Sequence, residues 1–243
     1  MNSAIRSPKP IPGRVEGTKT DPDIRYPTWV KIYQDLDKQK DPDPVRTVQS
    51  RLTSLKRQAG IKRGARIAIT AGSRHVANLP QITKAVVDFV RSEGANPFLV
   101  PAMGSHGGGT ETGQKEVLET LGFTENCIGA PICSCMDAVL LGHVENIPVY
   151  FDRLAAEADG IIVINRVKAH QVFKGEIQSG LYKMMVAGLG KKKGADAVHG
   201  SGRTDILGLI GDFILSAVPI LLGVAVLENS YDEPFGSVEL IHL

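Results

Sequence analysis

A lysine placed between two histidines is the first candidate for chemistry in this sequence. Lys183 lies among small and apolar residues in the run 165–200, with His170 before it and His199 after it. Histidine titrates near neutral pH and is suited to proton transfer. Small neighbours on a helix let a ligand lie close to the backbone and leave the lysine amine accessible. A solvated lysine on a polar helix face is the competing interpretation, and periodicity alone favours it.

Further polar residues follow three apolar segments that are typical of buried strands. AGSRH follows residues 65–70, MGSHGGGT follows 97–102 and RVKAH follows 160–165. In open parallel sheets the ligand crevice lies beyond the carboxyl ends of the strands. We therefore expect one edge of a sheet to gather six side chains: Ser73, Arg74, His106, Arg166, Lys168 and His170.

Each of these loops has a functional and a structural interpretation. Arg74, close to the start of the following helix, is suited to binding an anion, and a tight turn with a surface arginine explains it equally well. Three glycines after His106 cost backbone entropy and suggest that something approaches the main chain closely. His170 is explained as well by a hydrogen-bonded strand end as by catalysis.

The segments that must position these residues alternate between strand and helix. Strands are predicted at 29–36, 65–70, 97–102, 138–142, 160–165 and 221–227, and helices at 44–58, 79–94, 110–122, 151–158, 175–188 and 204–217. This alternation predicts an α/β protein with a mostly parallel, doubly wound sheet and helices on both faces, a Rossmann-like fold. In the helix expected from Gly175, the core stripe is Ile177, Leu181, Met184, Met185 and Gly188, and Lys183 shares another face with Glu176, Ser179, Gly180 and Ala187.

The chain is expected to divide into an N-terminal arm and one α/β domain. Residues 1–43 are polar and proline-rich, which is typical of an arm, and 44–243 form the domain. The apolar stretch 207–227 is about long enough to span a bilayer, but it contains Asp212 and Pro219. We interpret it as a helix that ends before Pro219, followed by a buried parallel strand.

Composition and net charge argue against two classes of binding partner, nucleic acid and acidic membranes. A net charge of +2 gives no strong attraction to nucleic acid or acidic membranes. The cysteines Cys127, Cys133 and Cys135 are too few and too irregularly spaced for a disulfide framework, so a reducing cytoplasm is the expected location. The sequence does not determine the oligomeric state, and a homo-oligomer stays open.

Two short motifs are weaker candidates. GLGKKKGA at 188–195 lacks the preceding strand and the Ser or Thr of a P-loop, so it is either a phosphate-binding turn or a solvated loop. No strand is followed by GxGxxG. The pair Cys133 and Cys135 has the spacing of two metal ligands but lacks a second pair.

Together, the run from Asn165 to His199 and GSHGGGT resemble the N-terminal domain of the nickel-dependent lactate racemase family, over roughly residues 60–230. These are α-hydroxyacid racemases and epimerases that use nickel and pyridinium-3,5-bisthiocarboxylic acid mononucleotide, the nickel-pincer nucleotide. The resemblance implies a small 2-hydroxy acid as substrate and cofactor-biosynthesis enzymes as partners.

The resemblance also implies a role for each candidate residue. Lys183 is similar to the lysine that forms a thioamide with the cofactor, and His199 to the histidine that completes the nickel coordination. His106 and His170 are similar to the pair of histidines that alternate as acid and base. Ser73 and Arg74 lie where the family binds the cofactor or the substrate anion.

This sequence departs from the family pattern in two places. AGSR lacks the acidic residue that precedes the arginine in the family, and the chain ends at Leu243 without the family's second α/β domain. If the resemblance holds, we expect the sequence to be a fragment, a truncated gene product or a stand-alone domain. Two alternatives to a racemase stay open: a non-catalytic nickel- or nucleotide-binding module, and a nucleotide-using oxidoreductase or phosphoryl transferase.

Overall fold

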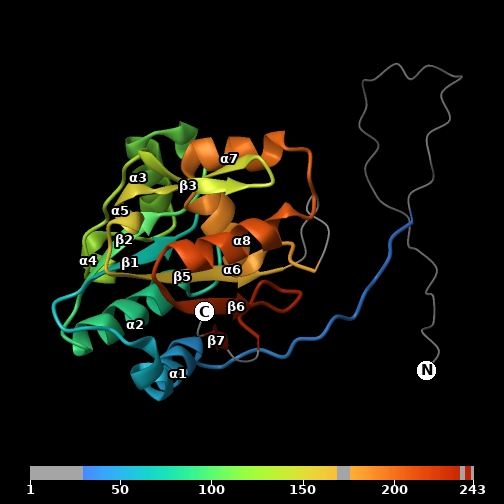
Figure 1. Ribbon diagram of the computed structural model, residues 1–243. Helices are drawn as coiled ribbons and strands as arrows, with labels where there is room; N and C mark the ends of the chain where they lie inside the picture. Colours follow the sequence, from blue (N-terminus) through green and yellow to red (C-terminus); the bar gives the residue numbers. More distant parts are fainter. Residues whose placement is uncertain (1–29, 169–175, 236–238, 242–243) are drawn as a thin grey trace, which may run out of the picture. The chain divides into compact units, whose positions relative to one another are not determined.

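A computed structural model describes residues 30–168, 176–235 and 239–241. The chain separates into two compact units, residues 1–37 and 38–243. The second unit is built around a five-stranded sheet with helices on both faces (Figure 1). Its strands are β1 (Arg66–Ala71), β2 (Asn96–Pro101), β5 (Gly160–Val167), β6 (Ile220–Leu227) and β7 (Glu239–Ile241), and its longer helices are α1 (Pro44–Ala59), α2 (Leu79–Ser92), α3 (Glu111–Thr120), α7 (Lys191–Gly200) and α8 (Ile206–Ala217).

Strand order places a topological switch point in the middle of this sheet. The order is β2-β1-β5-β6-β7, with β1 parallel to both β2 and β5, β5 parallel to β6, and β7 antiparallel to β6. The chain moves from β1 outward to β2 and later from β5 outward in the opposite direction to β6. In such sheets the loops at the carboxyl ends of the two central strands frame the ligand crevice. Here those strands are β1 and β5.

The central strands are buried on both faces because alternate side chains enter two different cores. Ile67 and Ile69 pack into the core that contains α1 and α2, while Ala68 packs into the core under α8. Ile162 and Val163 of β5 divide between the same two cores. This double burial explains their nearly unbroken apolar sequences. The predicted Rossmann-like α/β fold is confirmed.

A separate β-hairpin covers part of the second core. Strands β3 (Ala138–Val144) and β4 (Ile147–Asp152) pair antiparallel and are followed by the short helix α5 (Arg153–Ala156). The strand predicted at 138–142 is therefore real, but it lies outside the main sheet. The helix predicted at 151–158 is shorter than expected, because Phe151 and Asp152 complete β4. A further short helix, α4 (Glu125–Ile128), precedes the hairpin.

Local sequence signals fix the ends of α1. The Asp43 side chain accepts a hydrogen bond from the Arg46 backbone N–H, Pro44 occupies the first turn, and Gly60 adopts a left-handed conformation just after the helix. These are the usual start and stop signals of a helix. The helix predicted at 44–58 is confirmed.

The apolar stretch 207–227 divides as expected into α8 and β6 on either side of Pro219. Within the described residues, no helix combines the length and the apolar character needed to cross a membrane.

Two predicted elements are wrong. Residues 30–36 form no strand, and Val30 (72 %), Ile32 (80 %) and Tyr33 (76 %) are exposed, because nothing in the described chain pairs with this segment. The helix expected from Gly175 begins at Gly180 instead, as α6 (Gly180–Lys183), and widens into the π-helical turn η2 (Met184–Gly188).

The later start of this helix has a local cause. Gly180 has a φ of 69°, which an L-residue rarely adopts, and its carbonyl accepts a 2.7 Å hydrogen bond from Asn165 Nδ2 at the end of β5. Glu176 and Ser179 are therefore not on the helical face that carries Lys183. Leu181, Met184, Met185 and Gly188 are buried as expected, and Ile177 packs against the same core.

Candidate functional site

The candidate site lies at the carboxyl edge of the sheet, next to the switch point. Ser73 in the loop after β1 and His106 in the loop after β2 are joined by a hydrogen bond between Ser73 Oγ and His106 Nδ1. The two loops are 33 residues apart in sequence. They meet because parallel neighbouring strands deliver their carboxyl ends to one edge.

Lys183 is brought to the same place by α6. Its side chain is partly buried, and its pKa is lowered from 10.5, first by desolvation and then by the nearby charges of Arg74 and Lys168. A cation that is both desolvated and surrounded by like charge loses its proton more readily. Lys183 thus differs from an ordinary surface lysine.

His106 belongs to the same electrostatic cluster although it remains open to solvent. Its pKa is lowered from 6.5 by partial desolvation, and further by Arg74 and Lys183. The charges that lower the pKa values of His106 and Lys183 thus come from one another's neighbourhood. We call this cluster of Arg74, His106, Lys168 and Lys183 the cationic site. Such a cluster favours an anion, and it keeps the imidazole neutral at pH 7.

An open cavity of ≈ 480 Å³ adjoins this cluster at the ends of β1, β5 and β6. Its lining is mainly charged and polar: Arg74, His75, Arg166, Val167, Lys168, Glu228, Asn229 and Asp232. The nearly buried carboxylate of Glu228 pairs with Arg166 and also accepts a 3.3 Å hydrogen bond from the Ala77 backbone N–H. This ion pair ties the end of β5 to the loops that follow β1 and β6.

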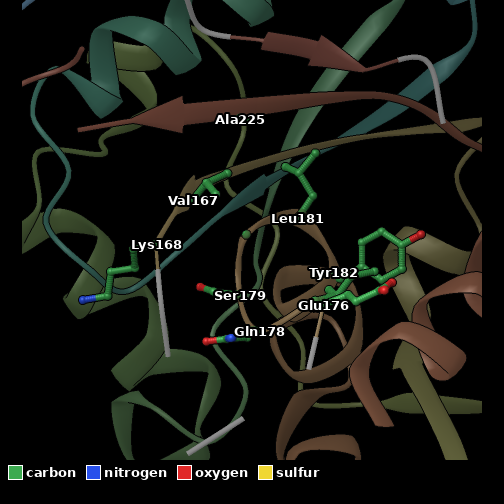
Figure 2. A pocket seen from close by; sticks show the side chains of 10 residues that line it. Val167, Lys168, Glu176, Gln178, Ser179, Leu181, Tyr182 and Ala225 are labelled. Atoms are coloured by element: carbon green, nitrogen blue, oxygen red, sulfur yellow. The ribbon is translucent and has the colours of Figure 1, made fainter. Parts of the chain in front are cut away.

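A second cavity, of ≈ 390 Å³, lies between the end of β5 and α6. Figure 2 shows Val167 and Leu181 on one side of it and Ser179 and Gln178 on the other, with Lys168 at one end. Val167 and Lys168 line both cavities. The end of β5 therefore separates a mainly charged space from a more apolar one.

The glycines after His106 have a structural explanation. Gly107, Gly108 and Gly109 have φ values of 65°, 66° and 64°, and they form the turn η1. A Cβ on Gly107 would lie 2.5 Å from the carbonyl carbon of Gly113 in α3, whereas one on Gly108 would meet nothing within 4 Å. The close approach to the main chain that was expected at these glycines is therefore made by the backbone of α3 at Gly107.

The structure brings together five of the predicted site residues. Arg74, His106, Lys168 and Lys183 form the cationic site, and Ser73 is hydrogen-bonded to His106 beside it. His170 lies outside the described residues. His199 is exposed on the last turn of α7. Arg166, predicted as a loop residue, belongs to β5.

Two buried ion-pair residues were missed by sequence reasoning. Glu228 directly follows β6, so the rule that selected the other three loops would have selected it as well. Lys191 was assigned to a phosphate-binding turn or a solvated loop, and both interpretations are wrong for it. It is fully buried at the start of α7, 2.7 Å from Asp152.

Among the residues that the structure describes, no group of three or more His, Cys, Asp or Glu side chains has metal-binding geometry. Cys133 and Cys135 are free thiols, and burial raises the pKa of both. A raised pKa makes a thiol a poor ligand and a poor nucleophile.

The fold and this site define a Rossmann-like α/β protein with a cationic, imidazole-containing site at its carboxyl edge. Residues 68–230 match the family described as Domain of unknown function (DUF362), and the chain belongs to this family. The match begins within β1 and ends just after β6, and it includes Ser73, Arg74, His106, Lys168 and Lys183. No curated protein matches the chain.

Proposed function

We propose that this protein is a racemase or epimerase of a small 2-hydroxy acid, of the nickel-dependent lactate racemase type, with its cofactor attached to Lys183. The observation that supports this best is a lysine of lowered pKa beside Arg74 and His106 at the switch point of the sheet. An amine with a lowered pKa is more often in the neutral, nucleophilic form. Lys183 is thus suited to a covalent bond with a carboxyl-type group of a bound cofactor.

His106 serves as the base for one enantiomer of the substrate. Its lowered pKa keeps the imidazole neutral at pH 7. In the tautomer whose Nδ1–H donates to Ser73 Oγ, the Nε2 lone pair faces away from Ser73 and accepts the proton of the substrate hydroxyl. Ser73 then fixes the orientation of the ring.

The cations of the site bind the negative charge of the ligand. Arg74 and Lys168 lie close enough to Lys183 to lower its pKa, and both line the charged cavity. A guanidinium binds a carboxylate or a phosphate through parallel hydrogen bonds. Arg74 is our candidate for the carboxylate of the 2-hydroxy acid, and Lys168 for the cofactor phosphate.

The donor set fits the nickel-pincer nucleotide on its organic side. Lys183 offers the attachment point, and Arg74 and Lys168 offer charge for acidic groups. For the metal, the family resemblance assigns His199, and His170 is the second acid–base residue. When bound, the cofactor supplies a hydride acceptor, which no side chain can provide.

The same proposal covers location and partners. We propose a reducing cytoplasm, consistent with three free cysteines, and cofactor-biosynthesis enzymes as the partners that load Lys183.

A binding module without catalysis is the second candidate. The cationic cluster that favours it would hold a nucleotide or another anion without any proton transfer. It needs Arg74 and Lys168 but not the Ser73–His106 pair.

The test uses isotopically labelled substrate. Protein co-produced with the cofactor-making enzymes is given a panel of 2-hydroxy acids that carry deuterium at C2, and chiral chromatography with mass detection follows the products. A racemase of this type interconverts the enantiomers and retains the deuterium, because the hydride returns to the same carbon.

Replacement of His106 by Gln should abolish turnover, whereas His143→Gln, a change of an exposed histidine of β3 that lines neither cavity, should not. Bound nickel without turnover of any acid in the panel would favour the binding module. Turnover with exchange of the deuterium for solvent hydrogen would exclude the hydride mechanism.

A further inference from the structure

The most unusual side chain outside the cationic site is Lys191. It is fully buried, and its Nζ lies 2.7 Å from Asp152 Oδ2 and donates a 2.6 Å hydrogen bond to the Pro101 carbonyl. Its backbone has a φ of 53°, in the left-handed region that disfavours L-residues. Asp152 is fully buried as well.

These contacts join three segments that are distant in sequence. Pro101 is the last residue of β2, Asp152 connects β4 to α5, and Lys191 begins α7. Asp152 Oδ1 caps α5 by accepting from the Ala155 N–H at 2.8 Å. The Asp152 backbone N–H also donates to the Leu189 carbonyl at 2.6 Å, so the hairpin is tied to the turn before α7.

Two of these segments, β2 and α7, are continuous in sequence with the parts of the chain that carry His106 and Lys183. The loop that leaves β2 leads to His106 and packs directly on η2, which continues from Lys183. Gly104 N–H donates to the Gly188 carbonyl at 3.1 Å, and a Cβ on Gly188 would lie 2.7 Å from the Ala102 carbonyl oxygen. Lys191 follows η2 and bonds to the last residue of β2, so it joins the two segments that make the contact between the His106 loop and the Lys183 helix.

Stability alone does not account for this arrangement. A buried ion pair is often no more stabilising than apolar residues of similar volume, since the attraction must offset the desolvation of two charges. The left-handed backbone at Lys191 adds a further cost. The Lys191–Asp152 pair has a large desolvation cost and connects the two sides of the site. Its role is therefore better explained by the relative position of these two sides than by stability.

We propose that Lys191 is a positioning residue that, through Asp152 and the Pro101 carbonyl, sets the placement of His106 relative to Lys183. The inference rests on the proposed function for what His106 and Lys183 do. Its readouts are taken on cofactor-free protein, so they do not depend on racemase activity.

The test compares three variants. Lys191→Met removes the ammonium and leaves the Asp152 carboxylate buried without its partner. Lys191→Met combined with Asp152→Asn leaves no buried charge and keeps an oxygen to cap α5. Lys193→Met is the matched control, because Lys193 is an exposed lysine on the same helix.

The readouts are thermal unfolding, the NMR titration of the His106 ring, and the NMR titration of Lys183 after reductive ¹³C-methylation. We expect Lys191→Met to unfold at a lower temperature and the double variant to recover most of this loss. In both, the pKa of His106 should still move up toward 6.5 and that of Lys183 toward 10.5, since the two groups are no longer held together. The Lys193→Met variant should match the wild type in all three readouts.

Three results would overturn the proposal. One is wild-type titration of both groups in a folded Lys191→Met or double variant. Another is a double variant in which the pKa values of His106 and Lys183 return to those of the wild type together with the unfolding temperature. This result would show that the Lys191–Asp152 pair has a structural role only. The last is a double variant that does not fold, because it contains no unpaired buried charge and its failure would assign the pair to folding alone.

Discussion

Arg74 lowers the pKa of two candidate catalytic groups at once, which makes it the most informative single residue of the site. Desolvation is the larger cause for both His106 and Lys183, and Arg74 is the second cause for both. The charge on Arg74 thus adds to desolvation in lowering the pKa of the imidazole below 6.5. As pH falls through that lowered value His106 becomes protonated and can no longer accept a proton.

We predict that Arg74→Ala raises the pKa of His106 and of Lys183, without restoring either to its ordinary value, because desolvation persists. Arg74→Lys keeps the positive charge and should keep both pKa values close to those of the wild type. The measurement is the NMR titration of the two side chains, with His106→Gln used to assign the ring. Unchanged titrations in Arg74→Ala would separate Arg74 from the site.

At the residue scale, the sequence predicted which loops lie next to each other better than it predicted which charged side chains are buried. Ser73, Arg74 and His106 could be predicted to meet because each follows a parallel strand. The burial of Lys191 could not be predicted. It depends on a left-handed backbone conformation at Lys191 and on the carboxylate of Asp152, 39 positions earlier in the sequence. Its neighbours Lys192 and Lys193 are exposed, so the run of three lysines carried no signal.

At the scale of elements, the η1 turn contains two glycines with nearly the same backbone conformation but different surroundings. Gly107 has a φ of 65° and contacts Gly113, while Gly108 has a φ of 66° and open space around it. The two positions therefore separate the cost of backbone conformation from the cost of steric overlap.

We predict that Gly108→Ala lowers the free energy of unfolding by about 1–2 kcal/mol, the cost of a left-handed L-residue. Gly107→Ala should lower it by more, since its Cβ would also overlap the α3 backbone, 2.5 Å from Gly113. Urea unfolding of both variants measures the difference. Equal losses would show that α3 can move away from the turn.

The helix that carries Lys183 illustrates why boundaries were harder to predict than elements. Apolar spacing continues smoothly from Ile177 to Gly188, so periodicity gives no stop before Gly180. The boundary comes from a long-range hydrogen bond, Asn165 to Gly180, and from the left-handed φ at Gly180. The π-helical turn that follows likewise has no signature in a period of 3.6 residues.

At the scale of the whole molecule, the doubly wound sheet explains both the stability and the location of the site. Among the described residues, the buried members of its two cores begin at Val48. The two faces are covered by separate sets of helices (Figure 1), and the loops of the site emerge from the carboxyl edge between them. Alternating strand and helix patterns predicted this architecture because each element buries a full apolar face or stripe.

We predict that deletion of residues 1–37 leaves a folded protein whose unfolding temperature lies within about 2 °C of that of the full chain, because none of the described core residues lies in this segment. Deletion of residues 1–60 is the matched control. It removes α1 and with it the fully buried Val48 and Leu52, and should lower the unfolding temperature sharply. A large loss in the shorter deletion would place part of the core in the arm.

The most direct test of the central claim is the intact mass of the protein after co-production with the cofactor-making enzymes and nickel. The account predicts an added mass on the wild type and on Lys193→Ala, a change of an exposed lysine on α7, and none on Lys183→Ala. Peptide mapping should place the added mass on Lys183. A wild type without added mass, or a Lys183→Ala variant that still carries it, would contradict the account.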